Sequence, residues 1–139
     1  MDKYLLDTNI CVFLLRGKYG IDRKIDIVGL ENCYISEITE AELKYGAELG
    51  RKQGLTKRIQ KLDELLASLQ VLPIRKAIDL YASEKARLRF AGTPADDDFD
   101  LLIGCTSIVY GMVMVTENLK DFKNLAGIRI ENWVTRTHN

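Results

Sequence analysis

Short apolar runs alternate with longer amphipathic stretches along most of the chain. Five of these runs have the length and the flanking turn residues of β-strands. Residues 112–115 form a continuous apolar segment, which is typical of a strand buried on both faces of a parallel sheet. Pro73 places the third run near the edge or end of a sheet. The predicted strands are 4–6, 33–35, 70–74, 112–115 and 128–130.

Between the strands, apolar residues recur at helical spacing. Leucines and one isoleucine at three- and four-residue intervals predict an amphipathic helix over 55–69. The pattern Thr39-Glu40-Ala41-Glu42 has the form of a capping box and predicts a helix start at Thr39. Gly92 and Gly111 follow two further stretches as stop signals. The predicted helices are 9–16, 39–50, 55–69, 75–90 and 100–110.

This alternation predicts an α/β fold with a mostly parallel central sheet of four or five strands, flanked by helices. The 139 residues suffice for one domain with a real core. With 47% hydrophobic residues, two prolines and no repeat or linker, residues 1–139 are predicted to form a single domain.

Charge is balanced over the chain. Lys plus Arg and Asp plus Glu both total 20, which argues against a sequence-independent nucleic-acid coat. A local basic patch can still grip RNA. Lys85, Arg87 and Arg89 precede an acidic loop and are predicted to face RNA. A second basic cluster at 51–61 is explained equally well as an exposed helix face of mixed charge.

The cysteines and the N-terminus bear on location. Cys11, Cys33 and Cys105 form no CxxC pair and lie in apolar stretches, which predicts buried free thiols. The N-terminus lacks the apolar core of a signal peptide, and no run is long enough to span a membrane. We therefore expect a cytoplasmic protein that does not engage membranes.

Histidine is nearly absent from the chain. The single histidine, His138, lies next to the C-terminus, which argues against Ser-His-Asp or Cys-His catalysis and against a histidine-rich metal site. If the chain is an enzyme, carboxylates or lysines must carry the chemistry.

Acidic residues follow several of the predicted elements. Asp7 ends the first strand, Glu42 lies early in the helix after the second, and Asp100 begins the helix before the fourth. Ligands of parallel α/β sheets bind beyond the carboxyl ends of the strands, so these carboxylates are expected to converge there. Converging carboxylates repel one another unless a cation neutralises them, and oxygen ligands favour magnesium or manganese. Such an ion suits phosphodiester hydrolysis.

Each of these residues also has a purely structural explanation. Asp7 can cap the following helix, and Glu42 can complete the capping box. Asp100 can simply favour the helix dipole, and Asn118 can cap a short helix. Their shared position at one sheet edge favours the metal site over the separate explanations.

Five blocks of the sequence, in order and at matching intervals, resemble the PIN-domain nucleases and specifically the VapC toxins of bacterial toxin–antitoxin pairs. The resemblance covers nearly the whole chain and implies a PIN-like three-layer fold. The blocks are Leu5-Leu6-Asp7-Thr8-Asn9-Ile10, residues 35–43, Asp100-Leu101-Leu102-Ile103-Gly104, residues 115–122 and residues 127–133.

The resemblance implies that Asp7, Glu42 and Asp100 bind Mg²⁺ or Mn²⁺ and form the catalytic site. It assigns a supporting role to Thr8 and Asn9, which would shape the site, and to Thr116. Asn118 stands where many family members have a fourth carboxylate. Either Asn118 ligates through its carbonyl or a water, or a neighbour replaces it. The candidate neighbours are Asp98, Glu117 and Asp121.

The same resemblance implies a function and partners. Family members cleave structured RNA, either transfer RNA or ribosomal RNA, and so arrest translation. They form homodimers, and a small VapB-type antitoxin assembles with them into a heterotetramer or larger complex. The alternative is a non-catalytic PIN module that binds RNA or protein, which Asn118 favours. The run Asp96-Asp97-Asp98 is interpreted as a solvated helix start in preference to a second metal site.

Overall fold

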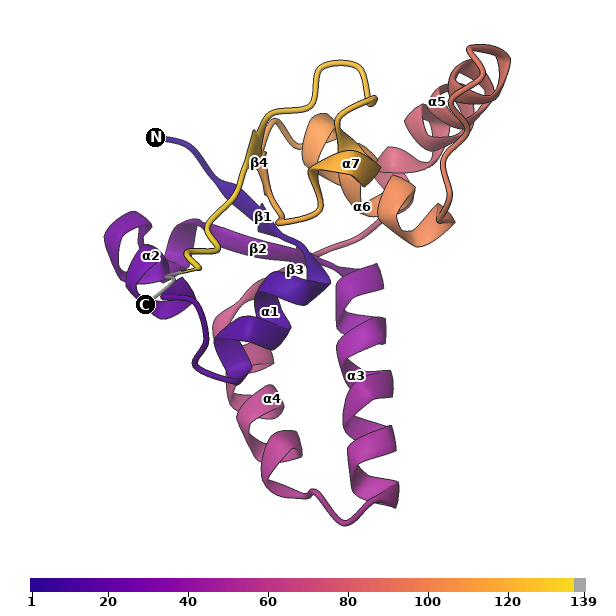
Figure 1. Ribbon diagram of the computed structural model, residues 1–139. Coiled ribbons are helices and arrows are strands. Elements are labelled where there is room, and N and C mark those ends of the chain that lie inside the picture. Colours follow the sequence, from indigo (N-terminus) through magenta and orange to yellow (C-terminus); the bar gives the residue numbers. More distant parts are fainter. Residues whose placement is uncertain (137–139) are drawn as a thin grey trace.

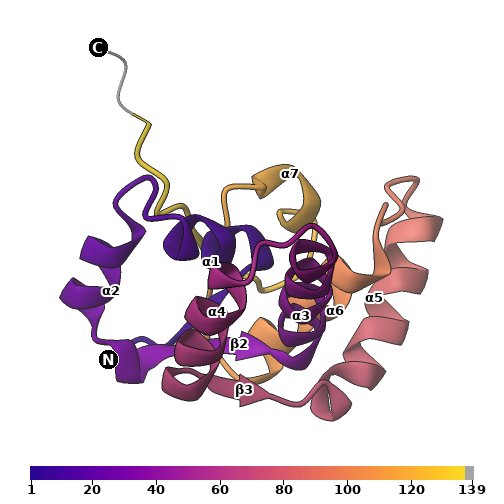
Figure 2. The same cartoon turned by 90° about the horizontal axis from the view of Figure 1, so that it is seen from below.

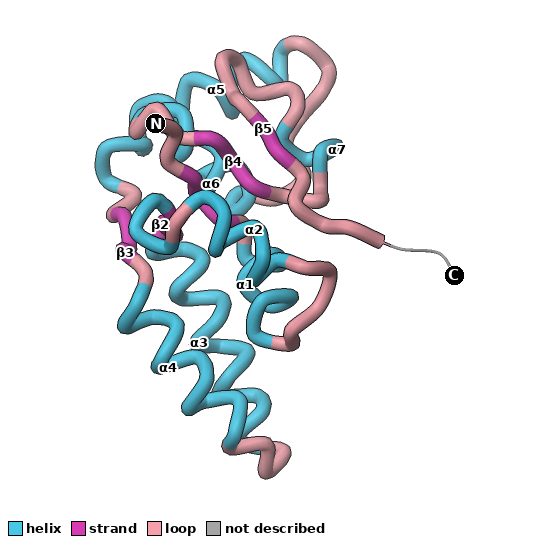
Figure 3. Tube along the Cα trace, turned by 90° about the vertical axis from the view of Figure 1, so that its left-hand side faces the viewer, coloured by secondary structure: helices cyan, strands magenta, loops and turns pink. Residues whose placement is uncertain are grey.

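The strands of the computed structural model, which describes residues 1–136, form one sheet in the order β3-β2-β1-β4-β5. Every neighbouring pair is parallel, so the predicted mostly parallel sheet is wholly parallel and has five strands. The strands run side by side through the middle of the molecule (Figure 3). They are β1 (Tyr4–Leu6), β2 (Cys33–Ser36), β3 (Gln70–Leu72), β4 (Val113–Val115) and β5 (Ile130–Glu131).

Successive residues of the central strands are buried on opposite faces of the sheet. Leu6, Ile35 and Val115 belong to one core, whereas Leu5 and Met114 belong to the other. This alternation with a period of two makes all these strand positions apolar, as expected for a parallel sheet covered on both sides.

Helices cover both faces of the sheet and give three layers, as the resemblance implied (Figure 1). Residues of α1, α2, α3 and α4 contribute to the core that contains Leu6, and residues of α5, α6 and α7 contribute to the other. The helices are α1 (Thr8–Leu15), α2 (Ile21–Val28), α3 (Glu37–Lys52), α4 (Lys57–Ser68), α5 (Ile78–Phe90), α6 (Asp98–Val109) and α7 (Leu119–Phe122), with short 3₁₀ turns at Leu30–Asn32 and Arg75–Ala77.

Two helices extend beyond the sheet. α3 and α4 pack side by side as a hairpin (Figures 1 and 2). Viewed from below, α5 lies at the opposite side of the molecule from α2 (Figure 2).

Residues from α1, α3 and α4 line a groove of about 430 Å³.

The five predicted strands and helices are all present, but several boundaries differ. The capping box at Thr39 is wrong as a helix start. β2 runs directly into α3, and the Oγ of Ser36 caps that helix by accepting a hydrogen bond from the Ile38 amide at 3.0 Å. The predicted helix 75–90 begins as a 3₁₀ turn. β5 comprises Ile130–Glu131, so Ile128 and Arg129 lie outside it.

The cysteines, Trp133 and the lengths of the helices complete the description of the fold. All three cysteines are free and buried, as predicted. Trp133 is 2% exposed and packs against the Tyr4 ring with the ring centroids 5.2 Å apart. No helix among the described residues is long and apolar enough to cross a membrane. His138 lies outside the described residues.

Candidate metal centre

The strand order reverses between β1 and β4. Successive strands β1, β2 and β3 extend the sheet in one direction, and β4 and β5 extend it in the other. In open parallel sheets, the crevice at such a switch point is where ligands bind. Asp7 follows β1 and Thr116 follows β4, so the topology brings these two residues together across the crevice.

Asp7 is a buried carboxylate that two hydrogen bonds hold in place. Its Oδ1 accepts from the Thr8 amide at 2.8 Å and thereby caps α1, while its Oδ2 accepts from the Thr116 hydroxyl at 2.8 Å. Asp7 is only 5% exposed to solvent. Burial raises the pKa of Asp7, and the charges of Glu42 and Asp121 raise it further, against the lowering effect of the two hydrogen bonds.

The turn after β4 continues from this contact. The amide of Asn118 donates to the Thr116 hydroxyl at 2.9 Å, so one hydroxyl joins Asp7 to the turn. The Asn118 side-chain amide donates to the Asp121 carboxylate. The Asn118 side-chain amide is therefore hydrogen-bonded, and this bond brings the Asp121 carboxylate next to the position at which the resemblance places a fourth carboxylate.

Asp100 approaches from the other side of the crevice, in the first turn of α6. The Asp97 carboxylate caps this helix and accepts from the Phe99 and Asp100 amides. Burial, and then the charges of Asp7, Asp97, Asp121 and Glu42, raise the pKa of Asp100 to about 7. The carboxyl group is therefore part of the same negative field as Asp7.

Glu42 faces the crevice from α3. Its Oε1 accepts a hydrogen bond from the Thr8 hydroxyl at 2.6 Å, and the same hydroxyl lies 3.1 Å from the Oγ1 of buried Thr39. Because Ser36 caps α3, Glu42 is not needed as a capping residue. Asn9 is exposed at the start of α1.

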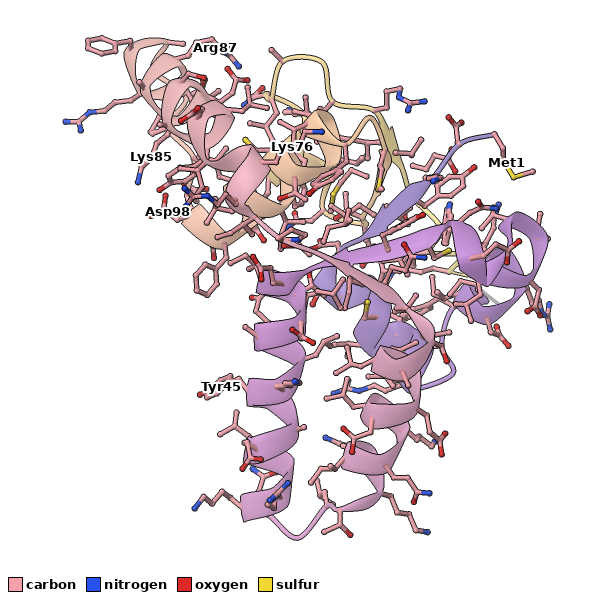
Figure 4. The ribbon with its side chains drawn as sticks, turned by 180° about the vertical axis from the view of Figure 1, so that it is seen from behind. Met1, Tyr45, Lys76, Lys85, Arg87 and Asp98 are labelled. Atoms are coloured by element: carbon pink, nitrogen blue, oxygen red, sulfur yellow. The ribbon has the colours of Figure 1, made fainter. Side chains whose placement is uncertain are left out.

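Other predicted residues lie in ion pairs of their own. The Asp98 carboxylate accepts from the Lys85 ammonium at 2.7 Å and from the Tyr81 hydroxyl at 3.0 Å, and these contacts lower its pKa. Arg87 forms an ion pair with Glu84 and donates to the Asn124 carbonyl. Figure 4 shows Lys85 beside Asp98, and Arg87 near the other end of α5. Arg89 is exposed on the last turn of α5.

Glu117 also has a basic partner. Its carboxylate accepts two hydrogen bonds from Arg136, at 2.7 and 2.8 Å, and this lowers its pKa. Asp121 is therefore the one of the three neighbours proposed to replace a fourth carboxylate that lies in the negative field of Asp7 and Asp100.

Two residues of this region were expected only as helix-start residues. Asp97 caps the helix that carries Asp100 and adds its charge to the field, and Thr39 supports the Thr8 hydroxyl. The spacing of Asp97 from Asp100 is that of a capping residue and its N3 partner, which is the signal in the sequence that points to it.

The donor set fits a hard divalent cation. Carboxylates without a basic partner surround the crevice, and hydroxyls orient two of them. Among residues 1–136, no three acidic side chains approach closely enough to hold one ion by direct contact. Mg²⁺ keeps several waters when it binds to proteins and takes only one or two carboxylates directly, so its binding does not require three such side chains in direct contact.

Comparisons with known proteins identify the family of the chain. The PIN domain family matches residues 4–128. The tRNA(fMet)-specific endonuclease VapC of Salmonella typhimurium is 32% identical over 134 residues, which are 96% of this chain and 99% of the relative. Ribonuclease VapC2 of Rickettsia felis is 31% identical over 133 residues, which are 94% of this chain and 97% of the relative.

Solved structures share the fold over nearly the whole chain. DNA-bound VapBC from Salmonella typhimurium matches with a TM-score of 0.84 and 31% identity, over 96% of this chain and 99% of the other. VapBC2 from Rickettsia felis, bound to a promoter DNA fragment, matches with a TM-score of 0.83 and 30% identity, over 94% and 98%. The chain belongs to the PIN domain family and, within it, to the VapC toxins of VapBC toxin–antitoxin systems.

Proposed function

We propose that this chain is a Mg²⁺- or Mn²⁺-dependent endoribonuclease that acts as the toxin of a VapBC-type system. One observation carries the proposal: Asp7, Glu42, Asp100 and Asp121 converge on a topological switch point, and none of them has an ion-pair partner within residues 1–136. Repulsion between unpaired carboxylates destabilises the folded state, and a bound cation removes this destabilisation.

Asp7, Asp100 and Glu42 are the residues that would hold the ion, and Asp121 would add its negative charge beside them. A bound divalent ion supplies a hydroxide from coordinated water and stabilises negative charge on a phosphate. The chain's own residues orient this site. Thr116 fixes the Oδ2 of Asp7, and Thr8 fixes Glu42, so the carboxylates hold their positions before the ion and the RNA arrive.

Asp100 is also expected to make metal binding depend on pH. With a pKa of about 7 in the absence of an ion, its carboxyl group holds a proton in part of the population at neutral pH. Binding of a cation releases that proton and leaves the carboxylate form. Metal affinity is therefore expected to rise with pH across the neutral range.

The proposed substrate is structured RNA, either transfer RNA or ribosomal RNA, and cleavage would arrest translation. Transfer RNA is the first to test, because two relatives are named tRNA(fMet)-specific endonucleases. Arg89 is exposed and available to RNA phosphates, whereas Lys85 and Arg87 contact RNA only with the atoms left over from their internal pairs.

The proposed protein partner is a small VapB-type antitoxin, and the groove between α1, α3 and α4 is its proposed binding site. Val12, Leu43 and Ala47 give this groove an apolar lining, and Glu42 lies at one end. An antitoxin segment with apolar residues followed by an arginine can fill the groove and place the guanidinium against the carboxylates. Ala47→Glu is expected to prevent complex formation while leaving RNA cleavage intact.

We also propose that the protein is cytoplasmic, that it forms a homodimer, and that it makes a heterotetramer or larger assembly with the antitoxin. Light scattering of the purified toxin and of the complex measures both assemblies. A monomer at micromolar concentration would contradict the homodimer.

The test of the activity is cleavage of purified transfer RNA and ribosomal RNA in Mg²⁺, in Mn²⁺ and in EDTA, with RNA ends mapped by sequencing. Wild-type protein is expected to cut at defined positions only with metal, and Asp100→Asn is expected to be inactive. If neither ion supports cleavage by a folded wild-type protein, the chain is a non-catalytic PIN module.

A further inference from the structure

A small cavity lies next to the metal centre, between the end of α5, the following loop, the start of α6 and α7. Its volume is about 260 Å³. Sites for drug-sized ligands occupy roughly 300–1,000 Å³, so this cavity suits a smaller group. Asp121 belongs both to its lining and to the negative field around Asp7 and Asp100, so the cavity opens beside the crevice.

Buried leucines and polar groups share the lining of the cavity. Leu88, Leu101 and Leu125 line it and are 3%, 2% and 4% exposed, so their positions are fixed by the core. Pro94 and Ala95 add an apolar wall from the loop between α5 and α6. A flat, weakly polar group that enters this space exchanges water for apolar contacts.

The rim carries charge of both signs. Lys120 and Lys123 lie on the α7 side, and neither forms an ion pair within residues 1–136. Asp96 and Asp121 are the acidic groups of the rim, and Thr93 adds a hydroxyl. The lysines attract a phosphate, and the carboxylates and hydroxyl can bond the donor edge of a base.

Three contacts hold the α7 side of the cavity in place. Glu84, which is 5% exposed, accepts from the Ala126 amide at 2.8 Å, and Arg87 donates to the Asn124 carbonyl at 2.7 Å. A Cβ at Gly104 would stand 2.5 Å from the Cδ1 of Leu125, so the glycine allows the segment to lie close against α6. The cavity is thus built into the packed structure and is formed before any ligand binds.

We propose that this cavity is a nucleotide subsite, which takes one nucleobase of the RNA against its leucines with a neighbouring phosphate on Lys120 and Lys123. The inference rests on the proposed ribonuclease function, because it deepens that site by giving it a pocket that reads a base next to the cleaved phosphate. A lining that combines buried leucines with polar groups, and two lysines without ion pairs among the described residues, match a nucleotide better than either an inorganic anion or an apolar ligand.

The test is an amide NMR titration of ¹⁵N-labelled wild-type protein in EDTA with AMP, GMP, CMP and UMP, each compared with ribose 5-phosphate. At least one nucleotide is expected to shift the amides of Thr93, Ala95 and Leu125 in a saturable way. Ribose 5-phosphate is expected to move only amides near Lys120 and Lys123. Equal shifts from ribose 5-phosphate, or no shift at these amides with any nucleotide, would overturn the base pocket.

A blocked variant gives the second measurement. Thr93→Trp fills the opening from an exposed position, and Thr56→Trp places the same side chain at the exposed N-cap position of α4 as the matched control. Thr93→Trp is expected to weaken nucleotide binding at least tenfold with an unchanged melting temperature, while Thr56→Trp binds as the wild type does. Unchanged nucleotide binding by Thr93→Trp would contradict the subsite.

The two proposals fail in different ways. A protein that binds nucleotides in the titration but cleaves no RNA with Mg²⁺ or Mn²⁺ refutes the proposed activity and leaves the subsite standing. A protein that cleaves RNA with the same KM after Thr93→Trp keeps its activity and refutes the subsite. Asp7→Asn separates the two in one chain, because it is expected to bind nucleotides normally and to cleave no RNA.

Discussion

Two groups of acidic side chains on this molecule differ in whether a basic side chain pairs with them. Glu84, Asp98 and Glu117 each have a basic partner within 2.9 Å, and the partner lowers the pKa of each carboxyl group. Asp7 and Asp100 lie in the crevice without such a partner, and the pKa of each is raised. Ion pairs therefore neutralise the carboxylates of the first group, whereas Asp7 and Asp100 form no ion pair within residues 1–136.

This difference indicates what each group is for. The paired acids fasten segments together: Asp98 joins the start of α6 to α5, and Glu84 joins the Ala126 segment to α5. The crevice acids are oriented by hydroxyls instead, through Thr116 and Thr8, which leave their negative charge in place. Under the proposed function, a bound cation would remove the cost in stability of this uncompensated charge, and such a cost is common at functional sites.

The largest effect is expected from the most buried crevice acid. Asp7→Asn removes the charge while its carbonyl oxygen still accepts from the Thr8 amide, so the fold is expected to survive. RNA cleavage should fall by more than about 100-fold, beyond the roughly 10–100-fold cost of losing an outer-shell partner. Cleavage rates with Mn²⁺, together with circular dichroism, measure this. Asp63→Asn, on the exposed side of α4, is the control, and equal rates for the two variants would break the comparison.

Thr116→Val tests the orienting hydroxyl. The variant leaves the Oδ2 of Asp7 and the Asn118 amide without this partner, and cleavage or metal affinity is expected to fall by about 10–100-fold. Thr106→Val is matched, because that buried hydroxyl donates to the Leu102 carbonyl inside α6. Kinetics and thermal melts of both variants decide the matter. A similar loss of cleavage in Thr106→Val would show that Thr116 acts only through stability.

Gly104→Ala tests the packing that holds α7 and Asp121. The new Cβ would meet Leu125 at 2.5 Å and Phe122 at 3.1 Å, so we expect a loss of about 1–3 kcal/mol of unfolding free energy. Cleavage should also fall, because α7 must move away from α6. Gly46→Ala in α3 meets nothing within 4 Å and is expected to be neutral or stabilising by up to about 1 kcal/mol. Urea denaturation measures both, and equal stabilities would refute the close approach.

Asp100 makes the stability depend on pH. Its folded-state pKa of about 7 is higher than the value of about 3.9 expected for an unfolded chain. The folded state therefore binds the proton more tightly, and this contribution to stability is complete below about pH 4 and lost as the pH rises through 7. In EDTA, the wild type is expected to be more stable at pH 5.5 than at pH 8, and Asp100→Asn should flatten that difference. Parallel curves for the two proteins would contradict it.

The smallest effect is expected from a paired acid. Asp98→Asn removes an exposed ion pair with Lys85, and pairs of this kind contribute little, so cleavage should stay within about twofold of wild type. The melting temperature is expected to be unchanged within error. A loss of cleavage as large as that of Asp7→Asn would move Asp98 into the metal centre and break the distinction between the two groups.

Much of the fold could be predicted because the apolar periodicity is strong. Residues 112–115 read as a doubly buried strand, and β4 lies inside them with both faces covered. α2 was not predicted although Ile21, Ile25 and Val28 recur at helical spacing, because it is only eight residues long and lies between Gly20 and Gly29, which are typical of a turn or loop. The start of α3 was misplaced because the capping box at Thr39 has the right letters but follows a true cap at Ser36.

For the site, the sequence indicates which carboxylates follow strand ends, and in the structure the charges of Asp7 and Glu42 contribute to the raised pKa of Asp100. The pairing of the remaining acids could not be derived in the same way. Whether Asp98, Glu117 or Asp121 joins the crevice depends on tertiary contacts with Lys85 and Arg136, which no local pattern encodes.

The most direct test of the account is an anomalous diffraction map from crystals of the wild-type protein soaked in Mn²⁺. The account predicts a strong peak between the carboxylates of Asp7 and Asp100, and no such peak in crystals of Asp7→Asn. A map from well-ordered wild-type crystals with no peak in the crevice would contradict the claim that these unpaired carboxylates exist to bind a cation.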